Sequence, residues 1–200
     1  MNRERWASLF TDTHNPPWHM DWRHVQMIHA VLCHELPASV VEIGTYRGAS
    51  TSAIVEAMEA YPEIAHATLV DYAFQMPEWV TQSVARRVGM YAGDSRGIKG
   101  LKADCWIIDG DHGEGAWDDL RLAHEGGARI IFVHDTHTRL LGVAGHGGAS
   151  EIAYRLRAEA KSYLEDSATR TGELTQRGLL AAFIGCNPKP ETVAAWRALQ

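Results

Sequence analysis

The apolar positions of this chain form short runs rich in β-branched residues, with stretches of helical spacing between them. The runs occupy positions 40–43, 67–71, 88–92, 106–108, 129–133 and 178–185. Short runs of this kind are typical of strands that are buried on both faces of a parallel sheet. After the first run, Ile54, Val55 and Met58 have the apolar spacing of a helix. This alternation of strands and helices predicts an α/β domain.

Further helices are expected outside this first unit. Asp21 is suited to cap a helix and Pro37 to stop one, so we expect a helix between them. Other helices are predicted over 79–87, from Ser150 to about residue 160, and over 193–199. Positions 163–175 are polar and compatible with a strand and a long turn.

The length of 200 residues, of which 46% are apolar, suits one domain with a full core. We expect a single domain over residues 1–200, with the core over 38–200 and residues 1–37 covering the site that this core carries. The first 20 residues are rich in aromatic side chains and interrupted by Pro16 and Pro17, which excludes one long helix. This segment either packs on the domain as a cover or forms part of a lid above a substrate pocket.

Charge and cysteine content narrow the choice of partners and location. The 19 Lys and Arg residues are unclustered and stand against 25 Asp and Glu residues, a formal net charge of −6. Nucleic-acid binding needs clustered basic residues, so a small-molecule substrate is expected instead. Cys33, Cys105 and Cys186 are far apart and odd in number, which favours reduced thiols and a cytoplasmic location. Neither a membrane-spanning run nor a signal core is apparent.

The most informative stretch is 39–52, Ser-Val-Val-Glu-Ile-Gly-Thr-Tyr-Arg-Gly-Ala-Ser-Thr-Ser, where a strand ends in two glycines and a helix follows. Gly44 lets the backbone leave the strand, and Gly48 lets a ligand approach the helix closely. The first amides of that helix would face the ligand. The spacing is neither the three-glycine dinucleotide fingerprint nor a phosphate loop, which disfavours a plain NAD or ATP site. An ordinary strand-to-helix turn of another α/β protein is the alternative.

Polar residues also follow the next two strands. Asp71 ends the second strand at roughly the distance at which dinucleotide-type folds place a carboxylate for the ribose hydroxyls. A helix cap or a turn is the alternative role for this residue. Asp94 and Ser95 follow the third strand and are candidates for a helix N-cap.

Ionisable side chains gather after two later strands. Asp109, Asp111 and His112 follow the strand 106–108, at the edge where open α/β sheets hold their ligands. Such a cluster is costly unless a cation neutralises it. His-Asp-Thr-His at 134–137 follows the strand 129–133 in the same way. Adjacent strands would bring Asp109 and Asp135 within a few ångströms of each other, which suits an oxygen-preferring ion such as Mg²⁺.

Three motifs together, Glu-Ile-Gly-Thr-Tyr-Arg-Gly, Ile-Asp-Gly-Asp-His and Val-His-Asp-Thr, resemble those of class I S-adenosylmethionine-dependent methyltransferases. They are similar in particular to the small-molecule O-methyltransferases of methyltransferase family 24, relatives of the macrocin and catechol O-methyltransferases. The resemblance spans roughly residues 38–160. It implies a Rossmann-like α/β fold whose seven-stranded, mostly parallel sheet has an antiparallel last strand beside strand five, with helices on both faces.

The resemblance also implies roles for individual residues. The cofactor S-adenosylmethionine would contact Glu42, Gly44, Thr45, Tyr46, Gly48, Ser50, Asp71, Asp94, Ser95 and Asp109. Within this set, Glu42 would lie near the ammonium group, Asp71 on the ribose, and the Asp94-Ser95 pair beside the adenine ring. A metal ion would be held by Asp109, His134 and Asp135, or by Thr136 in place of His134. Asp111 would be the base that takes the acceptor's proton, with His112 as a helper or alternative base.

Methyl transfer from this cofactor to an oxygen makes two demands on the protein. A sulfonium methyl group is already electrophilic, so the protein must align an acceptor oxygen with it and lower that oxygen's affinity for its proton. A metal ion does the latter by stabilising the alkoxide or phenolate. For Asp111 and His112, the alternative is a turn held by hydrogen bonds to backbone amides.

Two other functions are compatible with the same residues. A divalent-metal hydrolase could use the two clusters for a phosphate ester, and a non-catalytic S-adenosylmethionine-binding protein would need only the glycine turn and Asp71. The acceptor stays open, because the loops and the N-terminal segment that would contact it show no pattern. The aromatic N-terminal arm is a candidate contact of a homo-oligomer.

Overall fold

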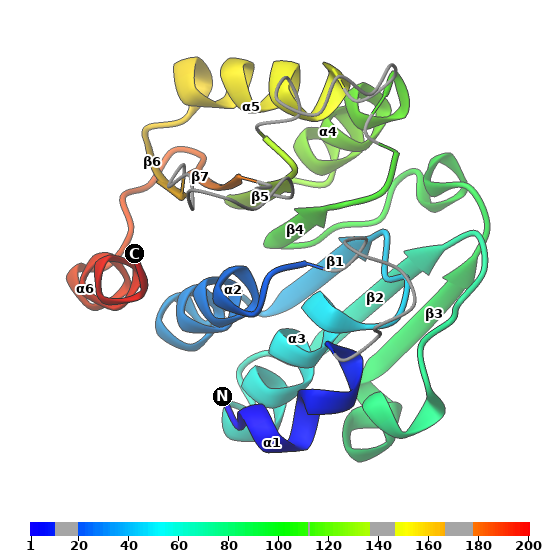
Figure 1. Ribbon diagram of the computed structural model, residues 1–200. Helices are drawn as coiled ribbons and strands as arrows, with labels where there is room; N and C mark the ends of the chain where they lie inside the picture. Colours follow the sequence, from blue (N-terminus) through cyan, green and yellow to red (C-terminus); the bar gives the residue numbers. More distant parts are fainter. Residues whose placement is uncertain (11–19, 112, 137–146, 167–177) are drawn as a thin grey trace, which may run out of the picture.

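The computed structural model describes residues 1–10, 20–111, 113–136, 147–166 and 178–200. Seven strands form one sheet in the order β3-β2-β1-β4-β5-β7-β6 (Figure 1). The strands are β1 (Ser39–Ile43), β2 (His66–Asp71), β3 (Val88–Ala92), β4 (Cys105–Ile108), β5 (Ile130–His134), β6 (Ser162–Asp166) and β7 (Leu179–Phe183). Each apolar run singled out in the sequence is therefore a strand.

The strand directions confirm the expected mostly parallel sheet. Strands β1 to β5 are parallel to one another, whereas β7 pairs antiparallel with both β5 and β6. The chain order reverses between β1 and β4, with β2 and β3 on one side and β5 on the other. At such a switch point an open sheet forms a crevice outside the carboxyl ends of its strands.

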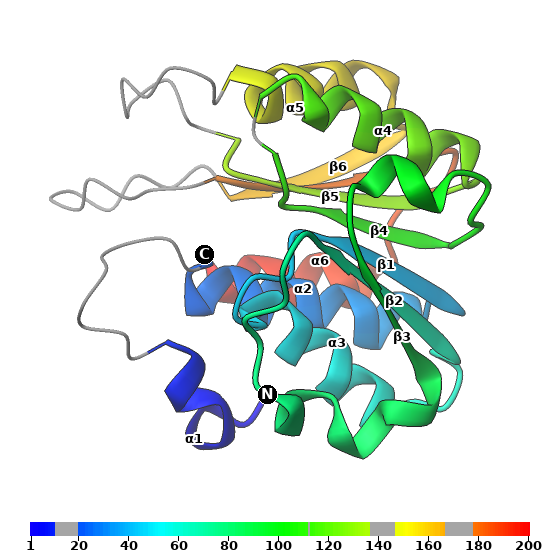
Figure 2. The same ribbon diagram turned by 90° about the vertical axis from the view of Figure 1, so that its right-hand side faces the viewer.

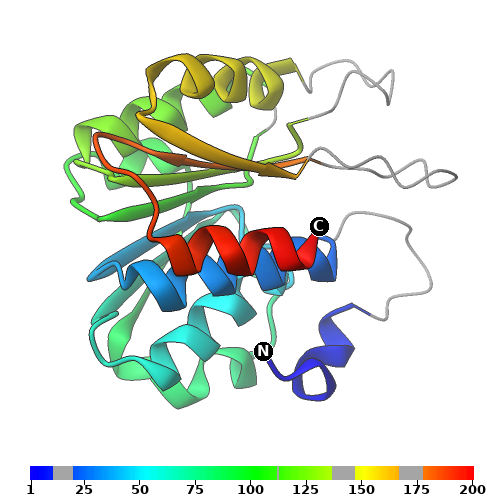
Figure 3. The same ribbon diagram turned by 90° about the vertical axis from the view of Figure 1, so that its left-hand side faces the viewer.

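Helices cover both faces of the sheet. The helices α2 (Trp22–Glu35), α3 (Ala49–Ala60) and α6 (Pro190–Leu199) lie on one face, and α4 (Gly115–Glu125) and α5 (Gly147–Glu159) lie on the other (Figures 2 and 3). The N-cap of α2 is Asp21, as predicted, and its side chain accepts a hydrogen bond from the amide of Arg23 at 2.9 Å. Within the described part of the chain, no helix is long and apolar enough to cross a bilayer.

The two helical layers bury alternate residues of the same strands. On the side of α2, α3 and α6, the core contains Val40, Ile107 and Phe132. On the side of α4 and α5, it contains their neighbours Val41, Trp106 and Ile131. Successive side chains of a strand point to opposite faces, so a strand that is buried on both faces must be apolar throughout. This explains the unbroken apolar runs of the sequence.

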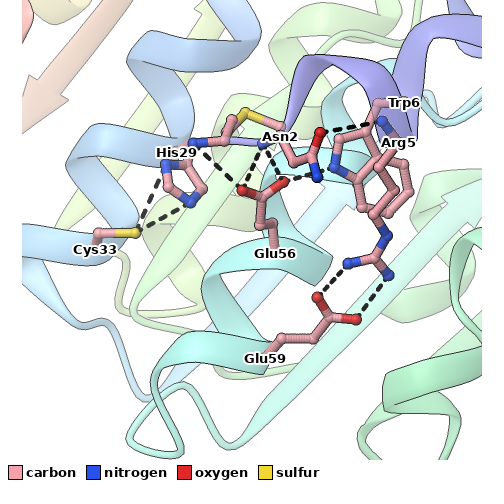
Figure 4. A network of polar contacts seen from close by, with 8 residues as sticks. Asn2, Arg5, Trp6, His29, Cys33, Glu56 and Glu59 are labelled. Carbon is pink, nitrogen blue, oxygen red and sulfur yellow. Dashed lines mark hydrogen bonds and ion pairs between the residues drawn. The ribbon is translucent and has the colours of Figure 1, made fainter.

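The start of the chain is anchored on α3. It forms a short helix α1 (Arg3–Trp6) and a 3₁₀ turn η1 (Ala7–Leu9). The buried Trp6 stacks on Trp79 with ring centroids 5.7 Å apart. Figure 4 shows the contacts with α3, in which Trp6 Nε1 donates to Glu56 at 2.6 Å and Arg5 donates to Glu59 at 2.7 Å. Residues 11–19 lie outside the described residues, so coverage of the site by this segment stays a prediction.

Some element boundaries differ from the prediction. The single helix expected over 79–87 is replaced by two 3₁₀ helices, η2 (Glu78–Val80) and η3 (Gln82–Arg87). β-branched residues lower helix propensity here because they lose side-chain freedom in an α-helix. Ser150 does not cap α5 but lies inside it, where its hydroxyl donates to the carbonyl of Gly147 at 2.9 Å. Helix α6 begins earlier than predicted, at Pro190, because proline is tolerated in a first helical turn.

Candidate functional site

A cavity of about 510 Å³ opens at the carboxyl ends of β1, β2 and β4. Its volume lies within the range of about 300–1,000 Å³ that is typical of small-molecule sites. Of the residues predicted from the sequence, those that line it are Gly44, Thr45, Tyr46, Ser50, Asp71, Ser95, Asp109 and Asp111. The glycine turn, the acids after β2 and β4 and a serine after β3 are thus brought together at the switch point of the sheet.

Gly44 is required by the close approach of two backbones. It has φ +86°, and a Cβ at this position would lie 2.1 Å from the carbonyl oxygen of Asp109. The same region is held by hydrogen bonds between strands, from Gly44 N to the carbonyl of Val70 and from Asp109 N to that of Ile43, both at 2.9 Å. The bend after β1 can therefore sit against β4 only if residue 44 lacks a side chain.

The rest of the turn also has unusual backbone geometry. Gly48 is the N-cap of α3 with φ +88°, and it is not among the described residues that line the cavity. A Cβ at Gly48 would contact the side chain of Met76 at 2.7 Å. Tyr46 has φ +45°, a region that non-glycine residues rarely occupy and that is found at functional sites.

Asp71 lines the cavity and holds the glycine turn. Its Oδ2 accepts a hydrogen bond from the amide of Tyr46 at 2.7 Å and one from the hydroxyl of Thr45 at 3.4 Å. Its Oδ1 accepts from the amide of Ala73 at 3.0 Å. A carboxylate has about four lone-pair positions, so these bonds leave capacity for further donors. The predicted turn-forming role and the predicted ligand-binding role are compatible in this geometry.

Glu42 lies beneath the turn and is not among the described residues that line the cavity. It is fully buried, and its carboxylate accepts hydrogen bonds from Ser50 and from Thr51, the latter at 2.6 Å. Burial raises the pKa of Glu42 to about 8, because the ionised form would lose its hydration. The residue thus ties β1 to the start of α3, and its predicted contact with an ammonium group stays a prediction.

Asp94 and Ser95 have different surroundings. Asp94 caps the 3₁₀ helix η4 (Ser95–Ile98) and pairs with Arg96, whose hydrogen bonds lower the pKa of Asp94 below its usual range. Ser95 lines the cavity, and its hydroxyl donates to Asp119 of α4 at 2.5 Å. Burial raises the pKa of Asp119 to about 6. The pairing of Ser95 with Asp119 is absent from the sequence prediction, since the two residues lie on different elements.

The expected cluster of acids forms at the ends of β4 and β5. Asp109, His134 and Asp135 each offer a ligand atom, and these atoms lie within 4.8 Å of one another. His134 Nδ1 lies 2.9 Å from an oxygen of Asp109 and 3.3 Å from one of Asp135. Asp135 has φ +59°, so it joins Tyr46 as a non-glycine residue with a left-handed backbone at this edge. His134 and Asp135 are buried, whereas Asp109 lines the cavity, so the cluster faces the cavity through Asp109.

Of the two proposed bases, Asp111 and His112, the structure describes Asp111. Asp111 lines the cavity, and its carboxylate accepts hydrogen bonds from the amides of Gly113 at 2.8 Å and of Gly115 at 3.1 Å. These bonds form the turn that the sequence offered as the alternative role of Asp111. The residue lines the cavity as well, so the two roles are compatible. His112 lies outside the described residues. The hydroxyl of Thr136, the alternative ligand, is buried and has no hydrogen-bond partner among the described residues.

His24 of α2 is buried and reaches the metal-ligand candidates. Its Nδ1 lies 3.2 Å from Nε2 of His134, and its Nε2 lies 3.1 Å from an oxygen of Asp166. Burial lowers the pKa of His24, because the imidazolium form would lose its hydration. The helical spacing of the sequence places this histidine on a face of α2, but it does not reveal which strands that face meets.

Comparison with protein-family models and with curated proteins gives no match. Among solved structures, the O-methyltransferase TomG from Streptomyces achromogenes, in complex with SAM, has a TM-score of 0.69 at 14% identity over 91% of this chain and 89% of that chain. An O-methyltransferase from Bacillus cereus in complex with SAH has a TM-score of 0.66 at 15% identity, with 90% and 89% covered. The SAH-bound Podospora anserina methyltransferase PaMTH1 has the same TM-score and identity, with 90% and 86% covered.

Because the identities are low, these likenesses show the fold alone. The chain has the Rossmann-like fold of the methyltransferases, as the resemblance in the sequence implied. Membership of methyltransferase family 24 stays a prediction.

Proposed function

We propose that this protein is an S-adenosylmethionine-dependent methyltransferase that acts on an oxygen of a small molecule with the help of a divalent metal ion. The observation that carries the proposal is the cavity at the switch point of the sheet, lined by Gly44, Asp71 and Ser95. It occurs on a fold shared with structures that hold SAM or SAH. S-adenosylmethionine would supply an activated methyl group, and the ion would stabilise the deprotonated acceptor oxygen.

The residues of the cavity fit the adenosyl part of this cofactor. Asp71 would accept hydrogen bonds from the ribose hydroxyls through lone pairs that its own turn leaves over. Ser95 lies after the neighbouring strand β3, where it would contact the adenine ring. Thr45 and Ser50 would contact the methionine part at the start of α3. Glu42 would act through Ser50, whose hydroxyl it binds.

The cluster of Asp109, His134 and Asp135 fits a divalent ion in charge and spacing. Two carboxylates and an imidazole are ligands for Mg²⁺, Mn²⁺, Fe²⁺ and Zn²⁺, and the imidazole favours the last three over Mg²⁺. Asp109 belongs both to the cluster and to the wall of the cavity, so it would join the metal site to the acceptor site. Asp111 lines the same wall and would take the proton of the acceptor hydroxyl.

Location and assembly belong to the same proposal. The three cysteines form no disulfide, which is consistent with a reducing cytoplasmic environment. A homo-oligomer stays an expectation from the aromatic N-terminal arm.

The test is calorimetry with S-adenosylhomocysteine, compared with ATP and NAD⁺. We expect the wild type to bind S-adenosylhomocysteine and neither nucleotide. Replacement of Asp71 by Ala should weaken binding at least tenfold, because hydrogen bonds to a charged group contribute about 1.5–3 kcal/mol each. The matched control is Asp118→Ala, which removes an exposed acid paired with Arg121 on α4 and should leave binding unchanged.

The same measurement separates the alternatives. A metal-dependent hydrolase would bind Mn²⁺ but not S-adenosylhomocysteine, which would reject the proposal. A non-catalytic binding protein would bind the cofactor with the same affinity in EDTA and in Mn²⁺. It would show no methyl transfer to any acceptor under either condition. Cofactor binding together with full transfer activity in EDTA would reject the metal ion alone.

A further inference from the structure

Asp119 places a carboxylate on the buried, otherwise apolar face of α4. Its neighbours on that face, Ala116, Leu120 and Ala123, belong to the hydrophobic core. Asp119 is 2% exposed, and it is not one of the described residues that line the cavity. Its Oδ1 accepts a hydrogen bond from the hydroxyl of Ser95 at 2.5 Å. A buried carboxylate is costly for packing alone, because it loses its hydration.

The protonation state of Asp119 determines the direction of its contact with Ser95. Burial raises the pKa of Asp119 to about 6, and three neighbouring acids, Asp111, Asp118 and Asp94, contribute to the rise. The carboxylate is still ionised at about pH 8, and in this form it can only accept hydrogen bonds. The distance of 2.5 Å agrees with a hydroxyl that donates to an ionised carboxylate, for which about 2.5–2.7 Å is typical. The single hydroxyl proton of Ser95 is therefore directed at Asp119.

Ser95 joins this buried acid to the part of the cavity that adjoins β3. Asp71, at the end of β2, is paired with Ala92 of β3, shortly before Ser95 in the chain. With the ribose on Asp71 and the methionine part at the glycine turn, the base of the cofactor lies on the side of Ser95. A hydroxyl whose proton is held by Asp119 has only lone pairs left for that base. Such an oxygen fits a hydrogen-bond donor and opposes an acceptor.

We propose that Asp119 is a positioning residue that orients the hydroxyl of Ser95, so that its oxygen accepts a hydrogen bond from the 6-amino group of adenine. The amino group of adenine donates, whereas the 6-oxo group of guanine or hypoxanthine accepts. A site built to bind a donor rejects an analogue that lacks it, because buried polar groups are then left unpaired. The pair thus makes the cavity selective for 6-aminopurine nucleosides. This inference rests on the proposed function.

A purely structural role makes a different prediction. If the pair only ties α4 to η4, its loss should lower the free energy of unfolding and weaken all purine ligands by the same factor. The ratio of the dissociation constants of two ligands that differ at the 6-position is therefore the informative quantity, because a uniform loss of affinity cancels in it.

The experiment is calorimetry at about pH 8 with S-adenosylhomocysteine and with S-inosylhomocysteine, in which a 6-oxo group replaces the amino group. The wild type should bind S-adenosylhomocysteine at least about tenfold more tightly. Asp119→Leu removes the acceptor and lets Ser95 turn its proton toward the ligand, so the ratio should fall about tenfold. The matched control is Asp118→Ala, the neighbouring exposed acid on the same helix, which should keep the wild-type ratio.

A second comparison tests whether Asp119 acts through Ser95, and it does not require that Asp119→Leu folds. Ser95→Ala should lower the ratio by itself, because the oriented oxygen is gone. The double variant Ser95→Ala with Asp119→Leu leaves no buried carboxylate without a donor, and its ratio should equal that of Ser95→Ala. A wild-type ratio in Ser95→Ala, or a further change of the ratio in the double variant, would overturn the inference.

The outcomes separate the inference from the proposed function. A wild-type ratio in folded Asp119→Leu would overturn the inference and leave the cofactor site as proposed. Equal binding of both ligands by the wild type would do the same. Binding of neither ligand by the wild type would reject the proposed function and this inference together.

Discussion

Replacement of Gly44 by Ala tests the backbone geometry on which the cavity depends. The new Cβ would lie 2.1 Å from the carbonyl oxygen of Asp109, 2.4 Å from its carbon and 2.7 Å from the amide nitrogen of Gly110. All three are backbone atoms, so no side-chain rotation relieves the overlap. The end of β1 must then separate from the end of β4.

The expected cost has three parts. The left-handed backbone at φ +86° costs about 1–2 kcal/mol for a residue with a Cβ. Overpacking costs about 1–3 kcal/mol. Loss of the hydrogen bond from Asp109 N to Ile43 O, now 2.9 Å long, costs about 1–3 kcal/mol if the amide stays buried. We expect the free energy of unfolding to fall by at least about 3 kcal/mol, which is a large part of the usual range of about 5–15 kcal/mol.

Gly100→Ala is the matched control, because Gly100 also has a left-handed backbone, with φ +88°, but a Cβ added there would have nothing within 4 Å. Only the backbone strain applies at this position, so we expect a loss of about 1–2 kcal/mol. Urea unfolding gives both values, and calorimetry with S-adenosylhomocysteine should show binding by the control and none by Gly44→Ala. Equal stability of the two variants would refute the close approach of β1 and β4.

Other predictions concern residues around the same cavity. Wild-type stability should fall as pH rises from about 4.5 to about 8, because the unfolded chain ionises Glu42 in this window while the folded protein keeps it neutral. Glu42→Gln should flatten that slope in urea unfolding at several pH values, and an unchanged slope would contradict a neutral Glu42. Ser95→Ala should cost about 1–3 kcal/mol, because it leaves the buried carboxylate of Asp119 without its hydroxyl donor; Ser150→Ala, which removes an exposed hydroxyl, is the control for its unfolding curve. Gly48→Val should abolish binding of S-adenosylhomocysteine in calorimetry, because the side chain would strain the N-cap of α3 and contact Met76; unchanged affinity would count against a cofactor at this turn.

The parts of the fold and site that follow from local patterns could be predicted from the sequence. The apolar runs identify the strands because both faces of the sheet are covered. Gly44 and Asp71 were found because each immediately follows or ends a strand, and the carboxyl ends of parallel strands meet at one edge. The acids after β4 and β5 come together for the same reason.

The side-chain contacts between elements could not be predicted in this way. Glu42 alternates with Ile43 along β1, so it lies on the same face as Val40. Strand periodicity gives this face, but the hydrogen bond from Ser50 depends on how α3 packs on the sheet. His24 meets His134 only because β7 is inserted between β5 and β6, and no local pattern specifies that strand order. The pairing of Ser95 with Asp119 likewise depends on how α4 packs.

The central claim is that the cavity beside the glycine turn holds the adenosyl group of the methyl donor. The most direct measurement is a crystal structure of the protein grown with S-adenosylhomocysteine. We predict electron density for the ligand between Gly44 and Ser95, with both ribose hydroxyls on the carboxylate of Asp71. An empty cavity at a saturating ligand concentration, or density for the ligand elsewhere on the protein, would contradict the account.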